Sequence, residues 1–383
     1  MRIWMRSCLR LSMYISKVHQ FYAKILHNSL MIKSVRVVGA GLIGTSIGLA
    51  LKSTSIDVEM VDSDLRAQEF GTDLVKGQPV NKPDLIVVCV PISQTQQVVL
   101  EQLKLNPDAI VCDIASVKSD LQLKVEAISD RAQNFISLHP MAGREIAGAE
   151  GARADLFQGR AWIAIKNQAT SKQAISAAEE LIKLCGATIY WLTSDEHDLL
   201  VAKISHLPQI LSSAIAGQLR HISVENLNIA GQGLRDVTRL AQSDSSLWSE
   251  ILLQNRKAIS TELIKIIENL NNLYQSLEDK NIDEVVKFLL AGVEGKKRIP
   301  GKHGSVERNY SNLAIVIDDK PGELARIFNE CANVLVNIED LNIEHSPGQA
   351  TGLITLSLSE SDCSKLLDHL DKQGFKVYRS KNR

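Results

Sequence analysis

The segment VVGAGLIG constrains this chain more than any other part of its sequence. It places Gly39, Gly41 and Gly44 in the spacing G-x-G-x-x-G, directly between an apolar β-branched run and a helical segment. The first glycine permits a tight turn, the second lets backbone approach a pyrophosphate, and the third lets helix and strand pack closely. The free N–H groups that open the helix, at Leu42 and Ile43, favour phosphate too. The segment therefore predicts a dinucleotide-binding βαβ unit.

An acidic residue at the end of the next apolar run supports this prediction. Asp62 closes the run VEMVD, where a carboxylate can accept hydrogen bonds from both ribose hydroxyls. It would also repel a 2′-phosphate, so the predicted cofactor is NAD rather than NADP. Two neighbours qualify this assignment: Asp64 is an alternative ribose contact, and Arg66 is near enough to soften the repulsion.

Apolar runs continue to alternate with helical segments as far as residue 166. The runs LIVVCVP, AIVCDIAS, FISLHP and AWIAIK are typical of strands in a parallel sheet buried on both faces. The stretch between VEMVD and LIVVCVP is short and rich in Gly, Pro and Asn, so no full helix is expected there. The predicted fold class is α/β, with a Rossmann domain over 31–166.

The region 167–298 begins with one more helix and the strand ATIYWL, then becomes almost wholly helical. Thr193 or Ser194 is expected to cap the helix that starts DEHDLL, and Pro208 to kink it. Apolar positions spaced three and four apart suit packing between helices and on a second subunit. Two long helices are expected at about 245–277 and 281–294.

A Gly- and Lys-containing linker, 299–311, leads to a compact last domain, 312–383. Its pattern reads strand, helix, two hairpin strands (LVNIEDLNIEH and ATGLITLSL), helix, strand. This βαββαβ order predicts a ferredoxin-like fold.

Composition narrows the classes of function. The chain has 383 residues, a net charge of −1 and 23% charged residues, so it carries no nucleic-acid footprint. No apolar run reaches the length of a bilayer span. The six cysteines form no C-x-x-C pair and are interpreted as reduced thiols in a cytoplasmic protein without a metal centre. They stand at positions 8, 89, 112, 185, 331 and 363.

Residues 1–30 differ from the rest because they carry five Lys or Arg and no acid. They read either as an Arg-rich transit segment or as sequence upstream of a true start at Met31. The closeness of the first strand to Met31 favours the second interpretation. We assign no fold or site to these residues.

Three positions stand at the carboxyl ends of consecutive predicted strands: Val90–Pro91, Ser116 and His139. Ligands of open α/β sheets lie outside the carboxyl ends of the strands. Histidine is the natural proton acceptor near neutral pH, although a lone histidine at a strand end is more often structural. Ser116 either bridges nicotinamide and substrate or caps the next helix. For His139, a position beside the predicted hydride path favours function.

The helical region offers a possible anion site. Arg235 and Arg239 lie one helical turn apart, with Asp236 between them. They form either a clamp for a carboxylate or, through Asp236 and Arg239, an ordinary surface pair. His206, just before Pro208, is either a site residue or a packed neutral histidine.

Together these segments resemble the prephenate (or arogenate) dehydrogenase family of tyrosine biosynthesis. The matching segments are VVGAGLIGTSIGLAL, VCDIASVKS, SLHPMAGRE, DEHDLLVAKISHLPQ and GLRDVTRLAQSDSSLW. The resemblance implies a homodimer that converts prephenate to 4-hydroxyphenylpyruvate, or arogenate to tyrosine, with NAD. The last domain, with IDDKPGELARI, is similar to an ACT domain and implies an amino-acid effector.

The resemblance also implies roles. His139 would take the proton of the substrate's ring hydroxyl, Ser116 would hydrogen-bond His139 and contact the nicotinamide, and Arg239 would bind a substrate carboxylate. The pocket would further include Glu145, His206, Ser243 and Trp248. The effector would contact Asp319, Gly322, Asn337 and Ile338.

Two residues depart from the family pattern. Arg144 stands where relatives commonly have a small polar residue, and it adds a charge beside the pocket. Gln209, also expected in the substrate pocket, stands where several relatives have a histidine linked to tyrosine sensitivity. Feedback through the last domain is therefore expected rather than direct inhibition at the active site.

Two other functions stay open from the residues alone. A hydroxy-acid dehydrogenase of the 6-phosphogluconate kind would need a catalytic lysine, for which Lys203 is a weak candidate, and Asp62 disfavours its usual NADP. A non-enzymatic NAD sensor is disfavoured because His139, Ser116 and Arg239 occur together.

Overall fold

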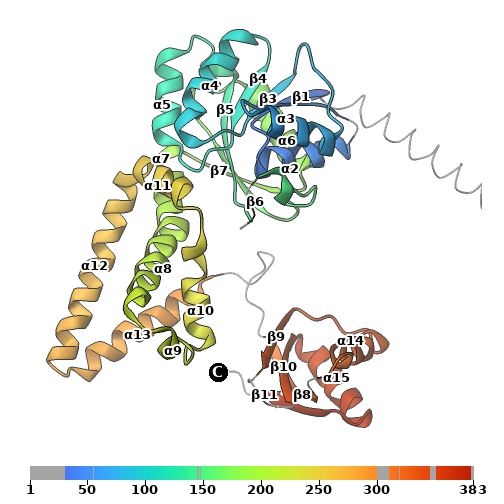
Figure 1. Ribbon diagram of the computed structural model, residues 1–383, viewed down its shortest axis with the longest axis vertical. Helices are drawn as coiled ribbons and strands as arrows, with labels where there is room; N and C mark the ends of the chain where they lie inside the picture. The colour runs from blue at the N-terminus through green and yellow to red at the C-terminus, as the bar shows by residue number, and fades with distance from the viewer. Residues whose placement is uncertain are drawn as a thin grey trace, which may run out of the picture. The chain divides into compact units, whose positions relative to one another are not determined.

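The computed structural model describes residues 31–54, 56–144, 146, 148–299, 310–318, 320–345 and 351–380. The chain divides into two compact units, one ending at Asn272 and one beginning at Leu273. Figure 1 labels most of the helices and strands of both units. The predicted extension 1–30, most of the predicted linker, Glu145 and Asp319 lie outside the described residues.

The first unit is built on a seven-stranded sheet with the order β2-β1-β3-β4-β5-β6-β7. Because β1 lies between β2 and β3, the winding of the chain reverses beside β1. Such a reversal is the switch point at which α/β sheets bind ligands, so the predicted α/β class is confirmed. The strands are β1 (Ser34–Val38), β2 (Asp57–Val61), β3 (Leu85–Val88), β4 (Ile110–Asp113), β5 (Phe135–Pro140), β6 (Ala161–Ile165) and β7 (Thr188–Leu192).

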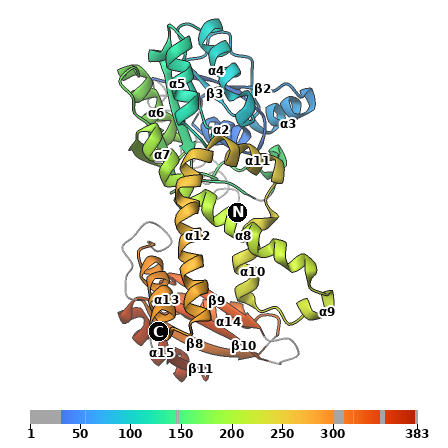
Figure 2. The same ribbon diagram turned by 90° about the vertical axis from the view of Figure 1, so that its left-hand side faces the viewer.

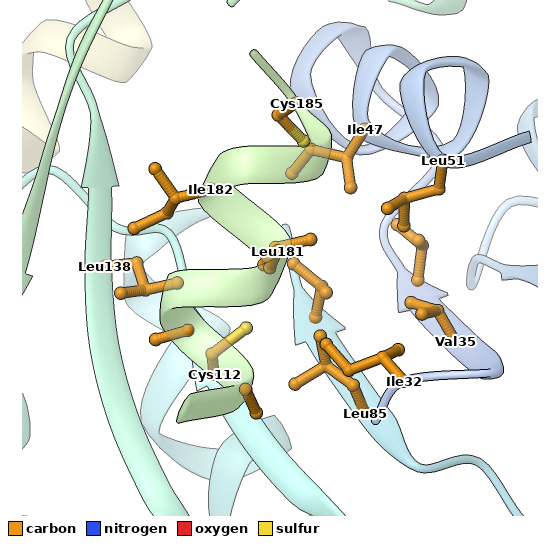
Figure 3. Packing of buried hydrophobic residues seen from close by; sticks show 14 of the residues in the cluster. Ile32, Val35, Ile47, Leu51, Leu85, Cys112, Leu138, Leu181, Ile182 and Cys185 are labelled. Atoms are coloured by element: carbon orange, nitrogen blue, oxygen red, sulfur yellow. The ribbon is translucent and has the colours of Figure 1, made fainter. Parts of the chain in front are cut away.

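Helices cover both faces of this sheet. Cys112 and Leu138 face one pair of helices, and Figure 3 shows them beside Leu181 of α6. Val111 and Phe135 face the other pair. Because both faces are buried, the strands read as continuous apolar runs. The first pair is α2 (Leu42–Lys52) and α6 (Lys172–Leu184), and the second is α4 (Ile92–Leu105) and α5 (Ser119–Ile128).

One helix of the sheet domain contradicts the sequence prediction. The segment between β2 and β3, expected to lack a full helix, contains α3 (Leu65–Val75). Gly71 lies within this helix and packs closely against Ala40, because a Cβ added to Gly71 would lie 3.1 Å from the Ala40 Cβ. Tertiary packing here outweighs the low helix propensity of glycine. The turn-forming residues follow the helix, which ends at Lys76 in the left-handed conformation.

The direction of β6 also differs from the expectation of a wholly parallel sheet. β6 runs antiparallel to β5 and parallel to β7. A parallel pair needs a crossover, usually a helix, and the described residues between β5 and β6 form only the short turn η2 (Ala149–Gly151). With α6 and β7 the sheet extends to Leu192, past the boundary predicted at residue 166.

The helical part of the first unit starts at Thr193, one of the two predicted caps, which forms a capping box. The Thr193 hydroxyl accepts from the backbone N–H of Glu196, whose carboxylate accepts from the backbone N–H of Thr193. The predicted kink at Pro208 takes the form of a π-helical turn just before it. The elements are α7 (Ser194–Val201), η3 (Ala202–His206), α8 (Leu207–Gln218), η4 (Leu219–His221), α9 (Val224–Leu227), α10 (Gln232–Thr238) and η5 (Arg239–Gln242).

Instead of the one helix expected over 245–277, the chain forms α11 (Ser245–Gln254) and α12 (Arg256–Glu278), interrupted at Asn255. The Asn255 amide is buried and donates to the backbone carbonyl of Asp198, 2.8 Å away. The interruption thus serves a contact between helices. α12 continues past Asn272 into the second unit.

The second unit contains α13 (Ile282–Lys297) and a four-stranded antiparallel sheet in the order β11-β8-β10-β9. Figure 2 shows these strands and their two helices, which confirm the βαββαβ prediction. Strand β9 begins at Asp340, so the first part of the predicted strand LVNIEDLNIEH is not strand. The elements are β8 (Ser311–Asp318), α14 (Glu323–Asn333), β9 (Asp340–His345), β10 (Thr351–Leu358), α15 (Glu360–Lys372) and β11 (Lys376–Ser380).

Candidate active site

The carboxyl ends of four neighbouring parallel strands, β1, β3, β4 and β5, form one edge of the sheet. The glycine loop follows β1, Val90–Pro91 follows β3, Ser116 follows β4, and His139 lies at the end of β5. The strand order thus arranges the predicted cofactor and catalytic positions in one row. This is the edge at which α/β folds bind their ligands.

The glycine loop fits a dinucleotide. A Cβ on Gly39, whose φ is +109°, would lie 2.3 Å from the Cys89 carbonyl oxygen, and one on Gly44 would lie 2.0 Å from the Gly39 carbonyl oxygen. A Cβ on Gly41 would meet nothing within 4 Å. Gly39 and Gly44 are therefore required by packing, whereas Gly41 borders open space in which a pyrophosphate can approach the start of α2.

Asp62 is held beside this loop. Its carboxylate accepts hydrogen bonds from the backbone N–H groups of Ala40 (2.7 Å) and Asp64 (2.9 Å). The Asp64 carboxylate instead accepts from the backbone N–H of Arg66 and caps α3. This difference favours Asp62 over Asp64 as the ribose contact.

His139 begins a chain of hydrogen-bonded side chains. Its Nδ1 lies 2.8 Å from Nε2 of His197, and Nδ1 of His197 lies 2.8 Å from Oδ1 of Asp198. The Asp198 carboxylate also accepts from the backbone N–H groups of Lys118 and Ser119, each at 2.9 Å. Asp198 on α7 therefore occupies the N-terminus of α5, where a negative charge is favoured.

A buried ion pair lies next to these hydrogen-bonded side chains. Lys118 Nζ is 2.6 Å from Oδ2 of Asp113, and neither side chain is exposed to solvent. Lys118 also donates to the Leu138 carbonyl, and the Ser137 hydroxyl donates to Asp113. Buried charges are tolerated when they are paired and hydrogen-bonded in this way. The pair ties the end of β4 to the end of β5, next to His139.

Burial shapes the protonation of these groups. It lowers the pKa of His139 well below the ordinary histidine value, and nearby His197 and Lys118 act in the same direction. Burial also lowers the pKa of His197, although the Asp198 carboxylate opposes this. Burial would raise the pKa of Asp198, but hydrogen bonds from His197 and from the start of α5 outweigh it and lower that pKa. The histidines are therefore neutral near pH 7, as a proton acceptor must be.

The structure bears on two of the expectations for Ser116, the hydrogen bond to His139 and the cap of the next helix, while its contact with nicotinamide and substrate stays a prediction. Among the described residues, no hydrogen bond joins Ser116 to His139, whose Nδ1 faces His197 instead. The residue at the N-cap of α5 is Lys118, so Ser116 does not cap that helix. Ser116 stays half-buried at the strand end beside His139.

His206 lies on the π-helical turn and is buried. Its Nδ1 is 3.1 Å from Nδ2 of Asn255, and its ring meets the Trp248 ring edge-on at 6.0 Å. Burial lowers the pKa of His206 to about 4. Two predicted pocket residues, His206 and Trp248, are thus brought together.

Gln209 reaches the turn that carries Arg239. Its amide donates to the Leu240 carbonyl at 2.9 Å, and the Ser243 hydroxyl donates to its carbonyl oxygen at 3.3 Å. Gln209 is buried, while Arg239 is exposed at the start of η5. Arg144, the other departure from the family pattern, is exposed and donates to the Gly151 carbonyl at 2.8 Å.

The described effector candidates lie beside α14 and before β9. Gly322 precedes α14 with a φ of +98°, which favours glycine. The Asn337 amide donates to the Glu339 carboxylate at 2.8 Å, and Ile338 packs against the core of the domain. Asn337 is exposed, so its side chain is accessible to a ligand.

Sequence reasoning did not single out five polar residues of this site. A signal was present: acids and a lysine interrupt apolar runs in VCDIASVKS and DEHDLLVAKIS. A polar residue in such a run is often buried and paired. Asn255, inside a long helical pattern, gave no comparable signal. The five residues are Asp113, Lys118, His197, Asp198 and Asn255.

Comparisons with known proteins identify the family of two regions of the chain. Residues 48–191 match the family model "Prephenate dehydrogenase, nucleotide-binding domain", and residues 193–291 match "Prephenate dehydrogenase, dimerization domain". The probable prephenate dehydrogenase NovF of Streptomyces niveus is 28% identical over 351 residues, which cover 88% of this chain and 97% of that protein.

Solved structures share the fold. Prephenate dehydrogenase from A. aeolicus, in complex with hydroxyphenyl propionate and NAD+, has a TM-score of 0.65 at 23% identity and covers 71% of this chain and 100% of its own. Synechocystis arogenate dehydrogenase has a TM-score of 0.57 at 26% identity and covers 69% of this chain and 98% of its own. The glycine loop, the two domain matches and these relatives lead to one assignment: the chain belongs to the prephenate dehydrogenase family of NAD-dependent oxidoreductases.

Proposed function

We propose that this protein is a prephenate dehydrogenase that uses NAD for the oxidative decarboxylation of prephenate to 4-hydroxyphenylpyruvate. The observation that carries the proposal is the row of ligand positions at one sheet edge, from the glycine loop to His139. The name of the relative NovF supports the same activity.

The residues divide the chemistry between them. The glycine loop and Asp62 would hold NAD+, which would supply the hydride acceptor. His139 takes the proton of the ring hydroxyl while hydride leaves the same carbon. The ring carboxylate then departs as CO2, and its bonding electrons make the ring aromatic. His139 returns its proton to the ring oxygen, so protons and charge balance.

The carboxylates of the substrate need cations. Arg239 is exposed on the turn η5, and we assign it to a substrate carboxylate. Trp248, His206 and Ser243 are assigned to the wall of the same pocket. Glu145, outside the described residues, keeps the same assignment by resemblance.

Arogenate is the alternative substrate, because the Synechocystis relative is an arogenate dehydrogenase. The two substrates differ only in a keto or amino group on the side chain. Arg144 and Gln209 are the residues in which we expect the preference to be encoded.

A single assay tests the function. NAD+ or NADP+ is supplied with prephenate or arogenate, and reduced nicotinamide is followed by absorbance. We expect turnover with NAD+ and prephenate, and no turnover with any of the four pairs would refute the proposal.

His139→Asn should lower kcat by about 10²–10⁴-fold with NAD affinity retained, the usual scale for acid–base catalysis. Arg239→Ala should chiefly raise KM for the substrate.

We propose that the protein forms a homodimer through its helical region. Within the described residues, one helical run, Ser194–His221, is long and apolar enough to cross a membrane on length and composition alone. It also joins the sheet domain through buried His197 and Asp198, so its apolar surface fits a contact with protein better than one with lipid. Exposed apolar residues on this unit support the assignment: Ile204, Ile215, Leu253, Ile264 and Ile267. A cytoplasmic location remains a prediction.

We assign an amino-acid effector to the last domain, at Gly322, Asn337, Ile338 and Asp319. The test is an amino-acid titration against the full chain and against a chain ending near Lys302. Inhibition should disappear in the shortened chain while turnover continues. Unchanged inhibition would place the effector elsewhere.

A further inference from the structure

Three histidines of the site carry hydrogen bonds whose directions can be worked out from groups with only one possible role. A carboxylate accepts and never donates, a backbone carbonyl accepts, and an amide NH2 donates. Asp198 supplies the first two of these groups, and Asn255 supplies the third. The proton positions follow from them.

The first arm runs through the Asp198 side chain. Nδ1 of His197 must carry a proton, because its partner Oδ1 of Asp198 can only accept. The buried, neutral His197 therefore has a lone pair on Nε2, which accepts from Nδ1–H of His139 at 2.8 Å. Neutral His139 is left with its lone pair on Nε2. That nitrogen forms no hydrogen bond with the described residues, so it is available to accept a substrate proton.

The second arm runs through the Asp198 backbone. Asn255 must point its NH2 group at the Asp198 carbonyl, which fixes the orientation of the amide. The same NH2 group lies 3.1 Å from Nδ1 of His206, so that nitrogen accepts. Neutral His206 therefore carries its proton on Nε2, where it can donate to a carboxylate or carbonyl oxygen.

We infer that Asp198, through His197 and Asn255, sets the two site histidines to opposite tautomers: His139 as a proton acceptor and His206 as a hydrogen-bond donor. His197, Asp198 and Asn255 are positioning residues, because they act through the histidines and not on the substrate. An imidazole in the wrong tautomer presents N–H where the reaction needs a lone pair, and this can cost orders of magnitude in kcat. The catalytic meaning of the tautomers rests on the proposed function.

The tautomers can be measured without substrate by 15N NMR of the histidine-labelled full chain near neutral pH. His139→Asn and His206→Asn assign the two signals, and His221→Asn, an exposed histidine, serves as the control. We expect a protonated Nδ1 in His139 and a protonated Nε2 in His206. The reverse tautomer at either histidine would overturn the inference. Failure to turn over prephenate would sink the proposed function but not this result.

Variants separate the two arms. Asp198→Asn should change the His139 tautomer and leave His206 unchanged, because His206 is held through the backbone carbonyl. Asn255→Leu should change the His206 tautomer and leave His139 unchanged. If both variants change both histidines equally, the separate arms do not exist.

Kinetics give an independent readout. His197→Phe keeps a ring but loses the acceptor, so kcat should fall by about 10²-fold or more with little change in KM. His197→Gln restores an acceptor and should recover part of the loss. Equal kcat in the Phe, Gln and parent proteins would contradict the inference, and so would loss confined to KM.

Discussion

The three glycines of the loop after β1 have different physical tasks although they belong to one pattern. Gly39 and Gly44 are fixed by contacts inside the protein, with backbone carbonyls where their side chains would be. Gly41 borders open space and adopts a φ of −77° that any residue accepts. Its lack of a side chain therefore matters to the ligand and not to the fold.

This contrast predicts opposite effects of two alanine substitutions. Gly44→Ala places a methyl group against the Gly39 carbonyl and should lower the free energy of unfolding by about 1–3 kcal/mol or more. Gly41→Ala should change stability by less than about 0.5 kcal/mol but raise KM for NAD+. Denaturant unfolding and steady-state kinetics measure the two. Equal destabilisation by both would show that Gly41 is also a packing residue.

At the scale of elements, two irregular places assemble the histidine cluster. The π-helical turn before Pro208 carries His206, and the interruption between α11 and α12 exposes the Asn255 amide to it. A regular helix at either place would change the directions of these side chains. The same region contains Gln209, which joins α8 to the turn η5.

Gln209→Leu tests whether α8 positions Arg239 through this turn. It removes the hydrogen bonds to Leu240 and Ser243, so KM for the substrate should rise about three- to tenfold, the scale of one or two hydrogen bonds. The chemical step does not use Gln209, so kcat should stay nearly constant. Gln218→Leu, exposed on the same helix, is the matched control. A lower kcat with constant KM would rule out this positioning role.

At the scale of the molecule, the buried histidines make stability depend on pH. Their folded pKa values lie below the unfolded value of about 6.5, so protonation favours the unfolded chain. The stabilisation is complete above pH 6.5 and is lost as pH falls toward the folded values, about 4 for His206.

We therefore expect the urea midpoint of the first unit to fall between pH 7 and pH 5. At pH 5, His206 alone should lower the free energy of unfolding by about 2 kcal/mol, because its pKa is lower in the folded protein than in the unfolded chain. Tryptophan fluorescence can follow the transition, since Trp248 contacts His206. His206→Asn should flatten the pH dependence. A midpoint that rises on acidification would contradict the assignment of neutral buried histidines.

The sequence by itself determined the features that depend on local pattern. The glycine spacing, the apolar runs and the βαββαβ order predicted both folds, and the family segments predicted His139 and Arg239. These features are encoded by neighbours along the chain, where backbone freedom and periodicity act. The same reasoning failed at α3, because packing of Gly71 against Ala40 outweighed local composition.

Only the tertiary structure decided the direction of β6, the interruption at Asn255 and the partner of His139. Each depends on residues far apart in sequence, such as His139 with His197 or Asn255 with Asp198. Hydrogen-bond direction and burial depend on which groups surround a residue in the folded protein, and sequence spacing does not encode them. The sequence thus determined that His139 ends an apolar run, and the fold decided which of its nitrogens carries the proton.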